Sequence, residues 1–186
     1  MKRHIYMGLL LMLPTFIMGC KSDIETKNVI RMLRSFEESS IELPDNLLKI
    51  EGQNSNFCQI DLSLPTMVYF HGKDECTDCA IYHLSDKEPM IQMADSLKTF
   101  QVVVLFSPKP EDVPHVIRAL SEREIGFPVY VDYDGLMPAT LIPTDQRFHS
   151  FLLYDKHPVM VGNPLSSKAL MSVFTKTLVS ININNH

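Results

Sequence analysis

The chain has 186 residues and a formal net charge of −5, from 17 basic and 22 acidic side chains. A broadly cationic surface is therefore not expected, and we do not expect the protein to bind nucleic acid. Hydrophobic residues make up 45% of the sequence, which is enough for one domain with a sizeable core.

The first twenty residues have the pattern of an export signal. Lys2 and Arg3 precede an apolar stretch, Gly8–Met18, which is too short to cross a bilayer because a spanning helix needs about 20 residues. A small residue directly before Cys20 resembles the bacterial lipobox, after which the cysteine becomes the lipidated N-terminus. We therefore predict that residues 1–19 are removed and that a lipid on Cys20 anchors the chain in the bacterial cell envelope, facing the periplasm or the cell exterior. An ordinary signal peptide with a chance cysteine is the alternative.

Residues 20–60 are predicted to form a polar tether followed by a helix and short strands. Apolar residues recur at helical spacing along 28–38. Two short strands flank a Pro-Asp-Asn turn, and a second turn follows; these elements are expected at 41–44, 47–50 and 51–54.

The remaining residues, 61–186, are predicted to form the main domain. In chain order we expect a strand at 66–71, a helix at 76–99 broken at Pro89, a strand at 101–106, a helix at 111–124, a strand at 128–132, a hairpin of 148–154 with 158–161, and a helix at 165–179. Strands that alternate with helices, followed by a hairpin and a final helix, predict an α/β fold with a mixed central sheet flanked by helices.

The clearest functional signal is the motif Cys76-Thr77-Asp78-Cys79. It follows the strand at 66–71 and Gly72, and it opens a helical pattern. Unpaired backbone N–H groups and the helix dipole favour a thiolate at such a position, and the thiolate is the reactive form in disulfide exchange. The motif therefore predicts that Cys76 and Cys79 form a redox-active pair.

The order of elements, with the dithiol after the first core strand, resembles the thioredoxin superfamily. Within it, the chain looks like the membrane-tethered, TlpA-like periplasmic branch. Residues Phe127–Gly135 resemble that branch's extra strand and Asp-x-Asp-Gly turn, and Phe151–Asp155 with Val159–Pro164 resembles its closing hairpin. The likeness covers roughly residues 62–180, and it implies a thioredoxin-like fold with a closing hairpin and a C-terminal helix.

The resemblance also implies a function, that of a membrane-anchored thiol–disulfide oxidoreductase that needs no cofactor. Cys76 would be the exposed attacking thiol and Cys79 the more buried resolving thiol, which breaks the mixed disulfide. The partners would be dithiols or disulfides of exported proteins and an unidentified redox partner. Asp74, Glu75 and Asp78 place negative charge near Cys76, which disfavours the thiolate, so the predicted site reduces or isomerises disulfides rather than forming them.

Three features depart from the superfamily's pattern. Phe148 stands where the superfamily has a cis-proline, Tyr82 stands where the tethered branch has an acid, and the first core strand lacks the buried aspartate of cytosolic thioredoxins. His83 and His149 are therefore candidates for proton transfer. The departures also favour an alternative function, a thioredoxin-like binding or scaffold lipoprotein in which the cysteine pair is a structural disulfide.

The cysteines allow two further interpretations. His71, Cys76, Cys79 and His83 have a spacing compatible with a Cys₂His₂ zinc site. We do not expect metal binding, because the set is far more compact than a zinc finger. Cys58 is predicted to be a small, buried hydrophobic residue, and the alternative is a third thiol that resolves or regulates the pair.

Overall fold

The computed structural model describes residues 25–123, 125–137, 142–143 and 146–183. The chain divides into two compact units, Met1–Ser35 and Phe36–His186. A helix spans residues 25–37, which confirms the helix predicted at 28–38. The predicted signal peptide and Cys20 lie outside the described residues. No helix in the described part of the chain is long and apolar enough to cross a membrane.

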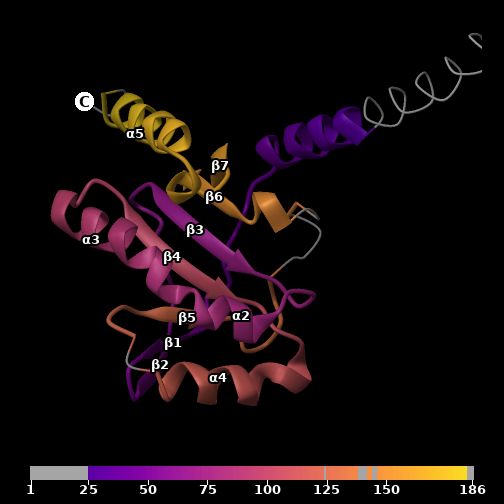
Figure 1. Ribbon diagram of the computed structural model, residues 1–186, viewed down its shortest axis with the longest axis vertical. Helices are drawn as coiled ribbons and strands as arrows, with labels where there is room; N and C mark the ends of the chain where they lie inside the picture. The colour runs from indigo at the N-terminus through magenta and orange to yellow at the C-terminus, as the bar shows by residue number, and fades with distance from the viewer. Residues whose placement is uncertain (1–24, 124, 138–141, 144–145, 184–186) are drawn as a thin grey trace, which may run out of the picture. The chain divides into compact units, whose positions relative to one another are not determined.

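The second unit is built on one mixed sheet of seven strands (Figure 1). In chain order the strands are β1 (Leu47–Glu51), β2 (Asn54–Cys58), β3 (Thr66–His71), β4 (Gln101–Phe106), β5 (Val129–Val131), β6 (Ser150–Tyr154) and β7 (His157–Val161). In space their order is β2-β1-β5-β4-β3-β6-β7. The three central strands, β5, β4 and β3, run parallel, and an antiparallel hairpin extends the sheet on each side. This is the predicted α/β fold, with a thioredoxin-like sheet and a closing hairpin.

The sheet has a hydrophobic core on each face. On β3, Met67 and Tyr69 belong to the core that the helices cover, whereas Val68 and Phe70 belong to the core on the opposite face. All four residues are buried, as expected for a parallel strand in the middle of a sheet. The end of β3 is therefore held rigidly, and the loop that carries the cysteine motif starts from it.

Four helices contribute to the first of these cores. They are α2 (Thr77–Tyr82), α3 (Glu88–Leu97), α4 (Val113–Ser121) and α5 (Lys168–Ile183). The predicted helix at 76–99 is divided into α2, the 3-10 helix η1 (Leu84–Lys87) and α3. Pro89 lies in the first turn of α3 and Pro114 in the first turn of α4. Proline is tolerated there because the first N–H groups of a helix have no partner within it.

The first hairpin differs from the prediction. Residues 41–44 are not a strand; instead β1 pairs with β2 around Gly52, whose φ of 59° suits a tight turn. Ile41 and Leu43 are nevertheless buried, in the core opposite the helices. The prediction of a strand at 41–44 was therefore wrong. The alternating apolar residues belong to an irregular segment that covers the sheet.

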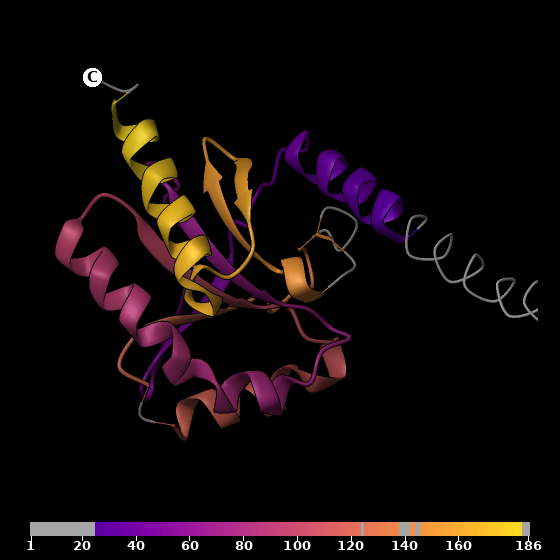
Figure 2. The same ribbon diagram turned by 45° about the horizontal axis from the view of Figure 1, so that its top comes forward.

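The closing hairpin agrees with the prediction more closely. Strands β6 and β7 are joined at Asp155 and Lys156, both with positive φ, which is the backbone geometry of a two-residue hairpin turn. Helix α5 follows and lies beside this hairpin (Figure 2). One face of α5 is buried through Phe174, which is 0% exposed and packs edge-on against Phe100 at 5.4 Å between ring centroids.

Phe174→Ala tests whether α5 is an integral part of the fold. Removing this buried ring is expected to lower the free energy of unfolding by about 3–5 kcal/mol. The neighbouring Val173 is 50% exposed, so Val173→Ala is the matched control and should change the free energy by less than about 0.5 kcal/mol. Urea unfolding of the full chain measures both values. Equal effects of the two variants would show that α5 is not anchored through Phe174.

Candidate redox site

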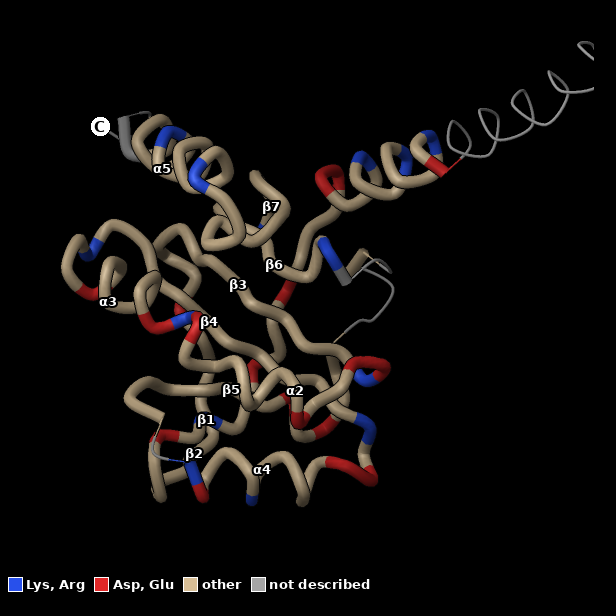
Figure 3. Tube along the Cα trace, in the orientation of Figure 1, with Lys and Arg blue, Asp and Glu red and all other residues tan. Residues whose placement is uncertain are grey.

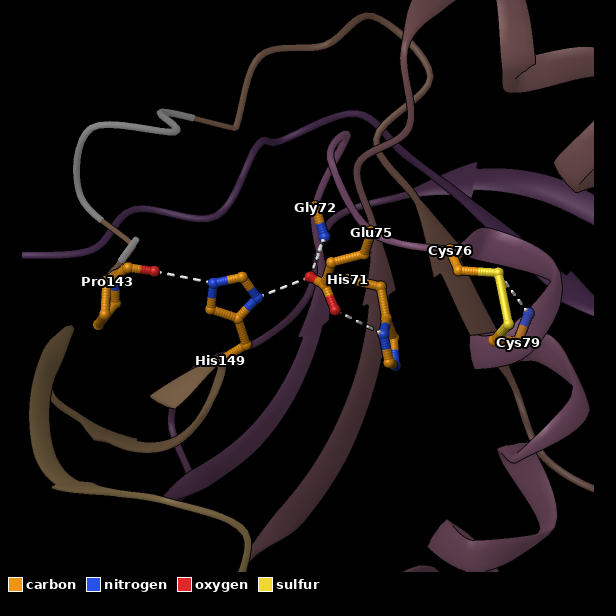
Figure 4. Close-up of polar contacts among 7 residues, drawn as sticks. All are labelled: His71, Gly72, Glu75, Cys76, Cys79, Pro143 and His149. Carbon is orange, nitrogen blue, oxygen red and sulfur yellow. Dashed lines mark hydrogen bonds and ion pairs between the residues drawn. A yellow bond between two sulfur atoms is a disulfide. The ribbon is translucent and has the colours of Figure 1, made fainter. Parts of the chain in front are cut away.

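Cys76 and Cys79 are joined by a disulfide at the start of α2, with their Cα atoms 5.3 Å apart (Figure 4). Cys76 is the N-cap residue of α2, and its Sγ accepts the N–H of Cys79 at 3.4 Å. The same contact would stabilise a Cys76 thiolate after reduction. Both cysteines are exposed. That Cys79 is the more buried of the two therefore stays a prediction.

A surface cavity of about 280 Å³ adjoins the disulfide. It is lined by the two cysteines of the disulfide and by four titratable side chains, those of His71, Glu75, His83 and Lys87. The predicted candidate His83 therefore does lie beside the disulfide, but its side chain is 63% exposed and 3.3 Å from the carboxylate of Asp86. Lys87 places its ammonium group over the ring of Tyr69, 4.4 Å from the centroid, and burial lowers the pKa of this lysine.

Glu75 is the centre of the polar contacts in Figure 4. Its Oε1 accepts the N–H of Gly72 at 2.7 Å and lies 2.6 Å from Nδ1 of His149. Its Oε2 lies 3.6 Å from Nδ1 of His71. Burial raises the pKa of Glu75, but the contacts with His149, His71 and Gly72 outweigh burial and lower the pKa from 4.5 to about 2. Glu75 is therefore an ionised, largely buried carboxylate.

His149 is held between two hydrogen-bond acceptors. Its Nδ1 faces the Glu75 carboxylate, and its Nε2 lies 2.8 Å from the carbonyl oxygen of Pro143. An ionised carboxylate and a carbonyl can only accept, so these two contacts favour the imidazolium form, in which both ring nitrogens donate. The carbonyl oxygen of His149 accepts the N–H of Phe70, which fixes its backbone beside β3. His149 lies on the side of Glu75 away from the disulfide in Figure 4.

A second cavity, of about 410 Å³, lies on the His149 side of Glu75. Its wall is formed partly by apolar side chains, among them Phe70, Met137 and Ile142. Glu75 lines this cavity as well as the one at the disulfide.

Two of the acidic residues around the motif, Glu75 and Asp78, are paired with histidines. Figure 3 shows acidic positions in the loop before α2 and within α2. Asp78, between the two cysteines, lies 2.8 Å from Nε2 of His115 on α4. Both side chains are well exposed, so this contact is weak. Sequence reasoning treated Glu75 and Asp78 only as negative charge near Cys76 and did not find their histidine partners, because these partners are distant along the chain.

The zinc interpretation is not supported. Among the described residues, no group of three or more histidine, cysteine, aspartate or glutamate side chains is arranged to hold a metal ion. His71, Cys76, Cys79 and His83 line one cavity but are not arranged as metal ligands, and both sulfurs are in the disulfide.

The other predicted positions do not line the cavity at the disulfide. Cys58 is a free, half-buried thiol on the edge strand β2, four strand spacings or roughly 19 Å from β3. It is thus neither fully buried nor close to the pair. Tyr82 is exposed at the end of α2. Phe148 ends the 3-10 helix η3 (Gln146–Phe148) directly before His149, and no peptide bond among the described residues is cis.

No protein-family model matches the chain, and no curated protein matches it. Its function must therefore be inferred from the fold and the site. A thioredoxin-like α/β fold that carries a Cys-x-x-Cys disulfide at the start of a helix fits a redox function.

Glu75→Gln tests the contribution of this carboxylate to stability. Because the pKa of Glu75 is lower in the folded chain than its usual 4.5, the stabilisation is fully present above pH 4.5 and is lost as the pH falls towards 2. The variant should unfold at lower urea concentration than the wild type at pH 7, and the difference should narrow between pH 4.5 and 2. Curves that stay parallel over this range would contradict the assigned network.

Proposed function

We propose that the chain is a thiol–disulfide oxidoreductase of the thioredoxin superfamily that acts on exported proteins. The observation that supports this function best is the exposed disulfide between Cys76 and Cys79, at the start of a helix that follows a central parallel strand. A purely structural disulfide gains nothing from this position. A redox-active one gains access to partners and a backbone N–H that stabilises the thiolate.

The proposed reaction is dithiol–disulfide exchange. In the reducing direction, the Cys76 thiolate attacks a disulfide of the partner, forms a mixed disulfide and expels one sulfur of the partner as a thiolate. Cys79 then attacks the sulfur of Cys76, which releases the second partner thiol and forms the Cys76–Cys79 disulfide. Two electrons pass from the cysteine pair to the partner. A second dithiol protein, the redox partner, must reduce the pair again.

We propose that the exchange runs in the reducing or isomerising direction. Glu75 is ionised and lines the same cavity as the cysteines, and a negative charge there disfavours the thiolate. Strong oxidants owe their potential to a stabilised thiolate. Lys87 lines the same cavity, and its positive charge favours the thiolate. The balance of these charges determines the reduction potential of the pair.

The reduction potential of Cys76–Cys79 is the decisive measurement. The full chain, purified in detergent, is equilibrated in glutathione and dithiothreitol buffers, and its free thiols are trapped and counted by mass. Reversible cycling between about −120 and −270 mV, nearer the lower value for a reducing enzyme, is the expected result. A disulfide that resists reduction below about −300 mV would contradict the proposal and favour the scaffold function. Cys58→Ser, which removes a thiol far from the pair, should leave the potential unchanged.

We also propose that a lipid on Cys20 anchors the chain in the cell envelope. The support is the sequence pattern of residues 1–20. When the full chain is expressed in bacteria with labelled palmitate, the wild type should incorporate the label and sediment with membranes. Cys20→Ala should lose the label and the membrane association, whereas Cys58→Ala should keep both. Label in Cys20→Ala, or none in the wild type, would exclude this anchor.

A further inference from the structure

His71 has two buried ring nitrogens without a hydrogen-bond partner among the described residues. Its side chain is 19% exposed. Buried polar atoms are nearly always hydrogen-bonded, so an exception calls for a physical explanation, and one such explanation is a role in catalysis. His71 is the last residue of β3, and it lines the cavity that contains the disulfide.

The His71 ring is held in place from two sides. It stacks on Phe106 of β4, with 4.8 Å between the ring centroids and 26° between the planes. Its Nδ1 faces Oε2 of Glu75 at 3.6 Å. Because the ionised carboxylate can only accept, this contact favours the tautomer in which Nδ1 carries the proton and Nε2 has a free lone pair.

We propose that His71 is the acid–base residue of the cysteine pair and that Glu75 is its positioning residue. This inference rests on the proposed oxidoreductase function. The titratable groups around His71 are Glu75 with its partner His149, and the other residues of the cavity, namely Cys76, Cys79, His83 and Lys87. His71 combines a restrained ring with nitrogens that have no hydrogen-bond partner in the described part of the chain.

The proton transfer completes the exchange reaction. When a thiolate of the partner attacks one sulfur of the disulfide, the S–S bond breaks and its electron pair leaves on the other sulfur as a thiolate. Protonated His71, whose side chain lines the same cavity as the disulfide, then gives a proton to this thiolate. In the opposite direction, neutral His71 takes the proton of a cysteine thiol, and the thiolate attacks the partner. The partner is oxidised in the first case and reduced in the second.

The two histidines named from the sequence are less suited to this role. Both ring nitrogens of His149 are engaged, by Glu75 and by Pro143, and His149 does not line the disulfide cavity. His83 lines the cavity, but it is well exposed and faces Asp86. His71 lines this cavity, its ring is restrained, and its nitrogens have no hydrogen-bond partner among the described residues, so it combines properties that each of the other two lacks.

The test is the rate at which dithiothreitol reduces the disulfide of the full chain in detergent, measured from about pH 5 to pH 9. The thiolate fraction of dithiothreitol itself rises with pH, and the measured rate is corrected for it. The corrected wild-type rate should still change with pH in one further step, which reports the protonation of His71. His71→Asn should lose this step and react about 100-fold more slowly. His157→Asn, which removes a surface histidine of β7, should behave like the wild type.

The other variants decide between explanations. Loss of the step in His83→Asn but not in His71→Asn would overturn the inference. If His71→Asn does not fold, Glu75→Gln is the deciding variant. Loss of the negative charge beside His71 should move the step in the rate to lower pH. A step that stays at the wild-type pH would overturn the inference. A His71→Asn protein with wild-type rates and a normally cycling disulfide would refute the role of His71 and leave the proposed function intact. A wild-type disulfide that does not cycle would refute both.

Discussion

The carboxylate of Glu75 is the group on which the candidate site depends. It lies in the loop between β3 and α2, where it is largely buried; it is bound by His149 and by the N–H of Gly72, and it lies 3.6 Å from Nδ1 of His71. A buried carboxylate is stable only when such partners compensate for its lost hydration. The loop conformation, the protonated state of His149 and the orientation of His71 therefore depend on one another, and the disulfide begins at the next residue of the chain.

The sheet makes this arrangement possible. The parallel strands β3 and β4 place His71 beside Phe106 in register, and the antiparallel pairing of β3 with β6 brings His149 to the same end of the sheet. Strand β3 is buried on both faces, so its end is a fixed point for the polar groups. The exposed disulfide thus lies beside a rigid, charged environment, and its immediate surroundings rather than its burial must set its potential.

Much of the fold could be predicted because its signals are local. The continuous apolar run at Gln101–Phe106 matches β4 at both ends, and the cysteine motif opens a helix as its position indicated. The strand predicted at 41–44 was wrong because apolar residues alternate equally well in an irregular segment that covers a sheet. The Glu75–His149 pair was not predicted because it joins residues 74 positions apart, and only the pairing of β3 with β6 brings them together.

Strand β2 affects how readily the protein could aggregate with other chains. It forms one edge of the sheet, where the outward backbone N–H and C=O groups could add a strand from another chain. Its sequence is Asn-Ser-Asn-Phe-Cys, and its first four residues are exposed. Polar side chains and the short length make this edge a poor template for self-association. The chain is therefore protected against edge-to-edge aggregation at this one of the two edges of its sheet.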